Sequence, residues 1–256
     1  MYFLLTSDGQ RIAVHAYGPR DAEESVVLLH GWWMDHRVFE EAVSRLLRQK
    51  RRVIAPDLRG FGGSAGAEVG VFLARMALDV YELVKWESLR NVVLVGHGLG
   101  AAVALRYLRL FSGFRVRRAV MISAGEVSRE AAQACDAWRS WGSAEAAAWF
   151  CREMWAQPPD PARMRWAEQA AFGASGLAAA AAWDAWATED WAADLLDAPV
   201  PVRFLHGTRD AFVPPASAEV LCKSGRDSAV YLLENAGHAI PLEAGAALCA
   251  AIEGDI

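Results

Sequence analysis

Two residues far apart in the sequence carry the side chains of a proton-transfer pair. Asp210 closes the segment 205–210 (LHGTRD), and His238 closes the segment 234–238 (ENAGH). An imidazole titrates near neutral pH and can accept and return a proton, and a buried carboxylate fixes its tautomer and stabilises its protonated form. Either residue alone would be a turn former or a loop histidine. Because each directly follows an apolar run, the two together predict a base that is held by an acid.

Three further motifs also follow apolar runs. They are the segments 29–33 (LHGWW), 56–64 (PDLRGFGGS) and 95–100 (VGHGLG). If each apolar run is a strand of one parallel sheet, the motifs lie at the carboxyl ends of the strands, where open α/β sheets bind their ligands. We therefore expect these motifs to meet at one edge of the sheet.

The hydrophobic pattern predicts the elements that must position these motifs. Runs rich in branched residues predict buried strands at 26–29, 52–55, 92–95, 119–122, 202–205 and 229–233, with segments of helical length between them, such as 38–48, 69–86 and 99–110. This alternation is typical of a mostly parallel sheet with helices on both faces. Residues 2–6 and 11–17 flank Asp8-Gly9 and predict an antiparallel hairpin at one edge. The predicted fold class is therefore α/β.

The alternation of strands and helices stops between residues 126 and 196. Ala-rich helical segments there predict a helical cap, 126–196, inserted into a core made of 1–125 and 197–256. Eight of the eleven tryptophans fall in this cap, and their indoles either pack the cap onto the core or line a pocket for a small apolar or aromatic substrate. The candidate substrate contacts are Trp33, His97, Trp138, Trp141, Trp155 and Trp186.

Composition and charge argue against several functional classes. The 256 residues are 54% hydrophobic and 22% charged, which is typical of one globular domain, and no apolar run approaches the ~18 residues of a membrane span. A net charge of −5 provides no basic field for nucleic acid. The N-terminus lacks the features of a secretory signal, so we expect a cytoplasmic protein. The four scattered cysteines indicate buried free thiols, and neither a metal nor an organic cofactor is implied.

Taken together and in this order, the motifs resemble those of the α/β-hydrolase superfamily over essentially the whole chain. In that family the motif at 96–100 is the nucleophile elbow, G-x-S-x-G, whose serine stands above the sheet. The resemblance implies that Asp210 is the catalytic acid and His238 the base. It also implies an oxyanion hole made by the backbone N–H groups of Trp32 and Leu99. The remaining polar residues of the motifs are expected to pack and brace loops; they are His30, His97, Asp57, Arg59 and Ser64.

The chain departs from the family at the centre of the elbow, where Gly98 stands in place of serine. Gly98 has no hydroxyl and cannot form an acyl-enzyme, so serine-type ester hydrolysis should be absent or very low. The elbow holds its central residue at positive φ, which glycine tolerates better than serine, so the fold should remain intact. Both oxyanion-hole amides survive a change of side chain at position 98.

Gly98 admits three interpretations. In the first, the chain is a serine hydrolase with a Ser-to-Gly change. The HGW motif followed by a cap resembles carboxylesterases and the methyl-ester hydrolases of cofactor biosynthesis, which implies an ester, thioester or similar acyl substrate. In the second, the enzyme needs no serine, because His238 takes a proton from the substrate while the two amides hold the oxyanion.

Residues 31–39 (GWWMDHRVF) add a local resemblance that favours the second interpretation. They resemble a stretch of the cofactor-free dioxygenases that cleave N-heteroaromatic rings. Those enzymes usually retain the elbow serine and place their acid after the strand that ends here at Ile122, where the nearest acid is Glu126. In the third interpretation the chain is a non-catalytic binding protein, but such a protein would not need both Asp210 and His238.

Overall fold

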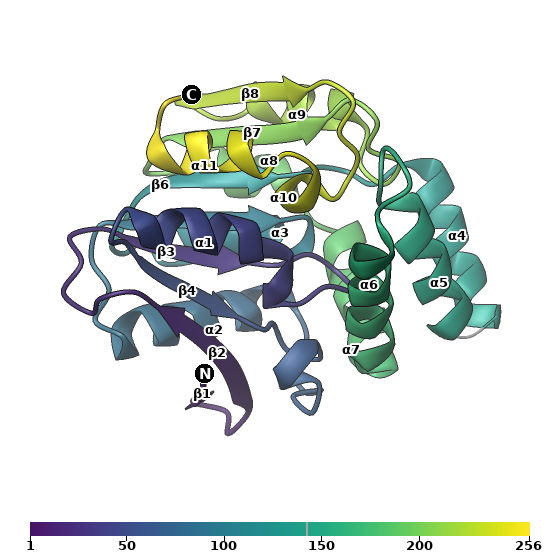
Figure 1. The fold of residues 1–256 in the computed structure, drawn as a ribbon, viewed down its shortest axis with the longest axis horizontal. Coiled ribbons are helices and arrows are strands. Elements are labelled where there is room, and N and C mark those ends of the chain that lie inside the picture. The colour runs from purple at the N-terminus through teal and green to yellow at the C-terminus, as the bar shows by residue number, and fades with distance from the viewer. Residues whose placement is uncertain (142) are drawn as a thin grey trace.

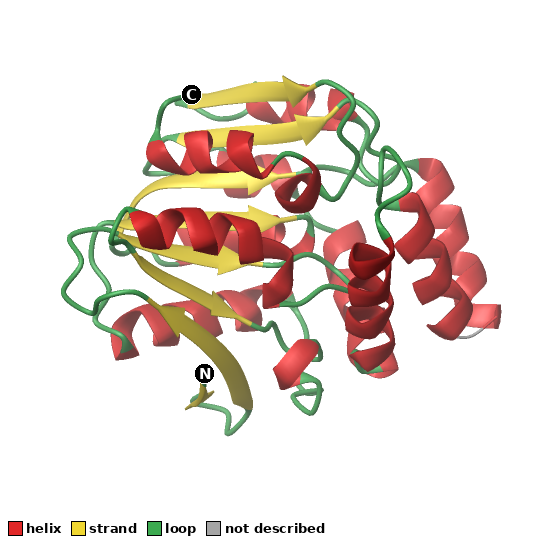
Figure 2. Cartoon of the chain, viewed as in Figure 1, coloured by secondary structure: helices red, strands yellow, loops and turns green. Residues whose placement is uncertain are grey.

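A computed structural model describes the backbone of residues 1–141 and 143–256, and their side chains except those of 136–141 and 143. One sheet of eight strands, in the order β1-β2-β4-β3-β5-β6-β7-β8, forms its centre (Figures 1 and 2). The strands are β1 (Tyr2–Leu5), β2 (Arg11–Tyr17), β3 (Ser25–Leu29), β4 (Arg52–Pro56), β5 (Val92–His97), β6 (Val116–Ile122), β7 (Val202–Gly207) and β8 (Ser228–Leu233).

The predicted strands and the edge hairpin are confirmed. β1 pairs antiparallel with β2, β2 pairs antiparallel with β4, and all other neighbours are parallel. Every residue of β3, β4 and β5 is buried, because helices cover both faces of the sheet at its centre. This burial is why these strands appear in the sequence as continuous apolar runs rather than as alternating ones.

Helices lie on both faces of the sheet (Figure 1). On one face α1 (Glu40–Arg48) packs against α11 (Gly245–Glu253), and on the other α2 (Leu73–Trp86), α3 (Leu99–Leu110), α8 (Trp191–Leu195) and α9 (Pro215–Cys222) follow one another. The shorter helices are η1 (His36–Phe39), η2 (Gly62–Ser64) and α10 (Ile240–Glu243). The helix expected over 69–86 begins only at Leu73, after Gly70 adopts a φ of +75°.

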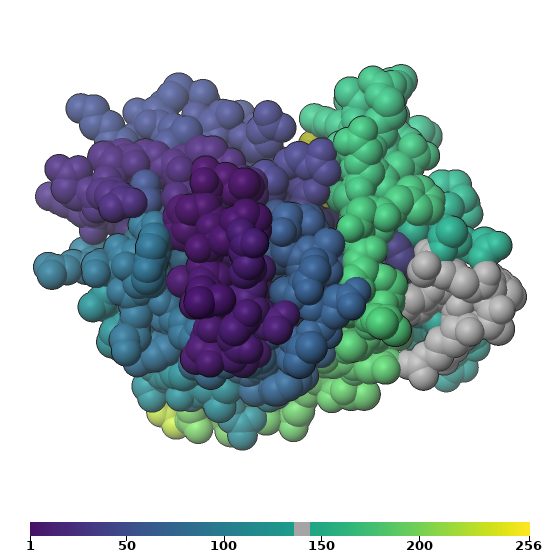
Figure 3. All heavy atoms as spheres, turned by 90° about the horizontal axis from the view of Figure 1, so that it is seen from below, coloured from purple at the N-terminus to yellow at the C-terminus, as the bar shows by residue number. Residues whose placement is uncertain are grey.

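Four helices follow β6 and lie beyond the carboxyl ends of the strands (Figure 1). They are α4 (Arg129–Trp141), α5 (Ser143–Glu153), α6 (Pro161–Gly173) and α7 (Gly176–Ala187). The Asp160 side chain accepts from two amides at the start of α6, and the Ser175 hydroxyl accepts from one amide at the start of α7. In the space-filling view the green part of the chain forms a block beside the purple and blue N-terminal half (Figure 3). We refer to residues 126–196 as the cap segment. None of the helices within the described residues is long and apolar enough to cross a membrane.

Candidate active site

Asp210 and His238 are in contact at the carboxyl edge of the sheet. Asp210 lies in the loop after β7 and His238 in the loop after β8, and the Nδ1 atom of His238 is 2.9 Å and 3.1 Å from the two carboxylate oxygens. The backbone N–H groups of Phe212 and Val213 also donate to this carboxylate, at 2.9 and 3.0 Å. Both side chains are buried. The carboxylate therefore holds the Nδ1–H tautomer of His238 and leaves Nε2 as the proton acceptor.

The electrostatics keep Asp210 ionised. Burial alone would raise its pKa, but the charge and the Nδ1–H bond of His238, aided by His206 and the Val213 amide, hold the pKa at about 2. His206 lies under the pair, with its Nε2 atom 3.6 Å from the carboxylate and donating to the Val213 carbonyl. At neutral pH Asp210 is thus a carboxylate that can stabilise a proton on His238.

The turn at Gly98 has the geometry of an elbow. β5 ends at His97, Gly98 has φ +50° and ψ −112°, and α3 begins at Leu99. A Cβ added to Gly98 would lie 3.5 Å from His238 Nε2 and 3.6 Å from Cζ2 of Trp186, which are ordinary contact distances. The place for a side chain at position 98 therefore opens directly toward the free nitrogen of His238.

Close approaches of backbone explain the other glycines of the elbow. A Cβ on Gly96 would lie 2.3 Å from the Gly100 carbonyl oxygen, and a Cβ on Gly100 would lie 2.2 Å from the Leu29 carbonyl oxygen. Leu29 and Gly96 are also register partners of β3 and β5. The loop that carries Trp32 thus starts against the elbow, because neither glycine has a side chain to keep the strands' ends apart.

The two expected oxyanion-hole residues lie on either side of this contact. Leu99 is the first residue of α3, and its N–H donates to no described residue, as is usual for the first turn of a helix. Trp32 follows His30-Gly31 after β3 and is buried. The indole Nε1–H of Trp32 donates to the Ala179 carbonyl at 2.8 Å, which connects this loop to α7.

Comparisons with known proteins show the family of the chain. A family model for the alpha/beta hydrolase family matches residues 26–251. The chain belongs to this family. AB hydrolase superfamily protein YisY of Bacillus subtilis is 25% identical over 226 residues, which cover 83% of this chain and 84% of the relative. A non-heme chloroperoxidase of Streptomyces lividans is 36% identical over 119 residues, 46% of this chain and 43% of the relative.

The fold of this family member also matches a solved structure. An esterase from Exiguobacterium antarcticum superposes with a TM-score of 0.90 and 24% identity, over 99% of this chain and 98% of the esterase. The expectation of an α/β-hydrolase fold, made from the order of the motifs, is confirmed.

Aromatic rings lie around His238 in this member of the family. The rings of Phe212, Phe150 and Trp186 have centroids 5.0, 6.2 and 6.2 Å from the imidazole. Trp32 packs against Phe150 and Trp183 against Trp186, and the Trp32 and Trp183 rings have centroids 4.9 Å apart. All five rings are buried, and only 1% of His238 is exposed, so the catalytic candidates are sealed in this conformation.

The expected substrate contacts are only partly assembled. Trp186 on α7 faces Gly98, and Trp33 packs edge-to-face on Trp32. His97 lies beneath the site, donating to the His238 carbonyl, rather than beside a substrate. The Trp155 indole bonds back to Cys151 and makes no ring contact with the described aromatic residues. The side chains of Trp138 and Trp141 fall outside the described part of the chain.

The motifs alone did not predict that Phe212 and Phe150 contact His238, nor that Trp183 packs against Trp32 and Trp186 beside it. Phe212 lies two residues after Asp210, so its position offers a weak signal. Phe150 and Trp183 come from Ala-rich helices of the cap segment, and nothing local distinguishes them from other apolar residues there.

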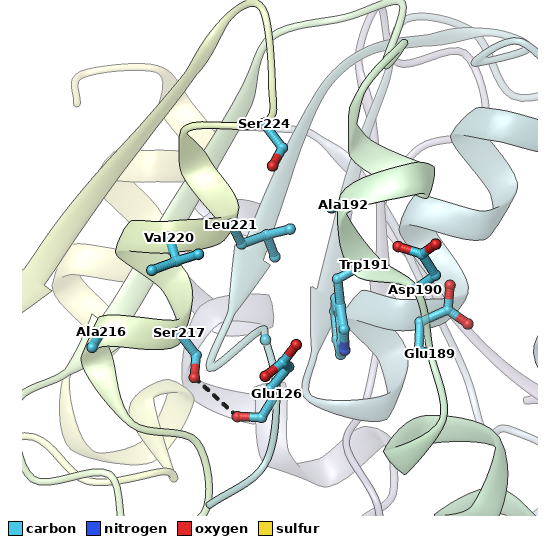
Figure 4. A pocket seen from close by; sticks show the side chains of 11 residues that line it. Glu126, Glu189, Asp190, Trp191, Ala192, Ala216, Ser217, Val220, Leu221 and Ser224 are labelled. Atoms are coloured by element: carbon cyan, nitrogen blue, oxygen red, sulfur yellow. Dashed lines mark hydrogen bonds between the residues drawn. The ribbon is translucent and has the colours of Figure 1, made fainter.

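A separate pocket of about 290 Å³ lies between the end of the cap segment and α9 (Figure 4). Trp191 and Glu126 are among its lining residues, whereas Gly98, Asp210 and His238 are not. Glu126, the nearest acid after β6, is exposed there, and its backbone carbonyl accepts from Ser217. Asp210, not Glu126, is therefore the acid that contacts His238.

One group of described residues has the composition of a metal site. The ligand atoms of His15, His36 and Asp57 lie within 4.8 Å of one another. However, the two imidazoles are stacked with centroids 3.3 Å apart and planes at 10°, so their in-plane lone pairs cannot point at one ion. Asp57 also accepts from the backbone N–H groups of His36 and Gly63. These contacts brace the loop after β4, in agreement with the structural role expected for that motif.

Proposed function

We propose that this α/β hydrolase has an active site built for apolar or aromatic acyl substrates, above all esters, and lacks only the nucleophilic hydroxyl. The observation that carries the proposal is the 3.5 Å distance between a Cβ at position 98 and His238 Nε2. A serine hydroxyl on that Cβ would be within hydrogen-bonding reach of the imidazole. The relatives that bear the names esterase and chloroperoxidase support an enzyme of this general kind.

In the proposed reaction each group has a defined role. The substrate carbonyl lies over position 98, and the amides of Trp32 and Leu99 hold the oxyanion that forms on attack. His238 removes the proton of the nucleophile and returns it to the leaving alcohol, while Asp210 stabilises the imidazolium. With Gly98 the covalent acyl-enzyme step cannot take place, so we expect the chain to be inactive as a serine hydrolase.

The aromatic enclosure supports an apolar or aromatic substrate. Large rings supply contact area with little conformational entropy, and Trp186 and Trp33 are the candidates closest to the proposed reaction. We propose that the cap segment acts as a lid, because His238 is buried beneath it and a substrate can enter only after α7 moves. His97 and Trp155 are not part of this proposed contact surface.

The Gly98→Ser variant tests the proposal. We expect it to hydrolyse short p-nitrophenyl esters and to accumulate an acyl-enzyme, detectable as a mass increase of the intact protein. Gly98→Ala is the matched control, because it adds the same Cβ at the same positive φ without a hydroxyl. A Gly98→Ser protein that folds but shows neither turnover nor an acyl adduct with any ester would contradict the proposal.

A second function is favoured by the intact Asp210–His238 pair. A glycine at position 98 does not prevent His238 from deprotonating an acidic substrate directly. Oxygen consumption, or formation of the substrate anion, with an added hydroxyquinolone would support a serine-independent enzyme of the dioxygenase type. In contrast, a ligand affinity that does not change in His238→Ala would favour a non-catalytic binding protein.

A further inference from the structure

The indole of Trp186 and Nε2 of His238 approach the same point beside Gly98. Cζ2 of Trp186 and Nε2 of His238 are 3.6 and 3.5 Å from a Cβ placed on Gly98. In an indole, Cζ2 and Nε1 are both bonded to Cε2, so the N–H group is only two bonds from the ring atom that approaches Gly98. A proton acceptor therefore borders the position that a serine side chain would occupy, and a hydrogen-bond donor lies close to it.

Both groups lack a partner in the described structure. Trp186 is 1% exposed, and its buried Nε1–H donates to no described residue. His238 uses only Nδ1, which contacts Asp210, and Nε2 makes no hydrogen bond to a described residue. Buried polar atoms are rarely left without a partner, so an orphaned indole N–H beside an available imidazole nitrogen indicates a small polar occupant.

We propose that this position is a site for a nucleophilic water, which Trp186 positions and His238 deprotonates for direct attack on an acyl carbon. The inference rests on the proposed acyl-transfer function and assigns it a route without a covalent intermediate. A water accepts from Trp186 Nε1–H and donates to His238 Nε2, which matches the two groups available. A methyl group on residue 98 would take the same room.

The steps balance without a further reactant. The water oxygen forms a bond to the acyl carbon, one water proton passes to His238 Nε2, and the carbonyl electron pair moves to the oxygen held by the amides of Trp32 and Leu99. The oxyanion then collapses, the bond to the leaving oxygen breaks, and that oxygen takes the proton from Nε2. The products are a carboxylic acid and an alcohol, and the protein returns to its starting state.

The test compares hydrolysis of p-nitrophenyl acetate by the full chain and by four variants. We expect the unchanged protein to exceed the buffer rate, and His238→Ala to lose about 100-fold of the protein-dependent rate through loss of the general base. Gly98→Ala should fall to the same level, because its methyl group displaces the water. Trp186→Phe keeps the ring and removes the N–H, and should fall about 10-fold in kcat.

Trp191→Phe is the matched control for the loss of an indole. Trp191 is also a buried tryptophan of the cap segment, but it lines the separate pocket of Figure 4, and its variant should keep the full rate. Thermal unfolding of each variant shows whether it is folded. Intact-mass spectra during turnover should show no acyl adduct on the unchanged protein.

Three outcomes would overturn the water site. They are equal rates for the unchanged protein and His238→Ala, equal rates for Trp186→Phe and Trp191→Phe, and an acyl adduct on the unchanged protein. If Gly98→Ser becomes acylated and active while the unchanged protein is inert, the water site fails and the proposed function stands. If no variant acts on any ester, the proposed function itself fails.

Discussion

The Nε2–H group of His97 donates a hydrogen bond to the backbone carbonyl of His238, with 2.7 Å between nitrogen and oxygen. The residue directly before Gly98 thus anchors the loop that carries the proposed base. Because Nε2 holds the hydrogen, Nδ1 of His97 is unprotonated, and it has no hydrogen-bond partner among the described residues. This contact makes the position of His238 depend on a second, neutral histidine.

Stability should fall as the pH drops from 8 to 5. Burial is the first cause that lowers the pKa values of His30, His97 and His206, and the charge of His238 adds to it for His97, whose pKa is about 3. Unfolded histidines have pKa values near ~6.5, so below that pH the unfolded chain binds protons that the folded chain does not. For His97 alone, the free energy of unfolding at pH 5 should be lower by on the order of 2 kcal/mol.

Urea unfolding at pH 8 and pH 5 measures this effect. His97→Gln keeps an N–H donor for the His238 carbonyl but removes the titrating group. The free energy of unfolding of this variant should therefore fall by about 2 kcal/mol less between pH 8 and pH 5 than that of the unchanged protein. An identical decline in His97→Gln and the unchanged protein would show that His97 is not held neutral.

The three glycines of the elbow should respond differently to alanine. Gly98→Ala should lower the free energy of unfolding by only about 1–2 kcal/mol. This is the strain of an alanine at positive φ, since its Cβ would make ordinary contacts. Gly96→Ala and Gly100→Ala place a Cβ 2.3 and 2.2 Å from backbone carbonyl oxygens. We expect each to lower the free energy of unfolding by about 3 kcal/mol or more. Chemical denaturation of the three variants ranks them. A Gly98→Ala protein as unstable as the other two would disagree with the open geometry at position 98.

Asp210→Asn should reduce turnover without unfolding the chain. In a Gly98→Ser background, the asparagine oxygen can still accept from Phe212 and Val213, but the negative charge that stabilises the imidazolium is lost. Serine-hydrolase triads lose on the order of 10⁴-fold in kcat from such a change. Steady-state kinetics with a p-nitrophenyl ester measures it, and an activity within a few-fold of the parent variant would remove Asp210 from the mechanism.

Arg59 should matter for stability rather than for activity. Its guanidinium is fully buried and donates to Asp79 at 2.7 Å and to Asp8 at 2.8 Å. Arg59→Met removes one of the positive charges that balance the carboxylate of the largely buried Asp79. We expect a loss of about 3 kcal/mol in the free energy of unfolding. The double variant Arg59→Met/Asp79→Leu should recover much of that loss. A double variant that is less stable than the single one would argue against an uncompensated charge as the cause.

Much of the fold could be predicted from the sequence because its signals are local. Buried parallel strands are continuous apolar runs, and the strands at 52–56 and 92–97 were expected to within two residues. The boundaries that differed depend on single glycines or on short 3₁₀ turns, as at Gly70 before α2 and at η1 before α1. Such boundaries respond to backbone geometry that the hydrophobic pattern does not record.

The sequence by itself determined that Asp210, His238 and the turn at Gly98 lie at strand ends, because a motif after a buried run can be nowhere else in a parallel sheet. Only the tertiary structure decided which indole edge approaches Gly98. Tryptophans in Ala-rich helices carry no signal of direction, since each can bury its ring equally well against a neighbouring helix or over the sheet. The packing of α7 against the loop of Trp32 turns Trp186 toward His238, and this contact joins residues that no local pattern connects.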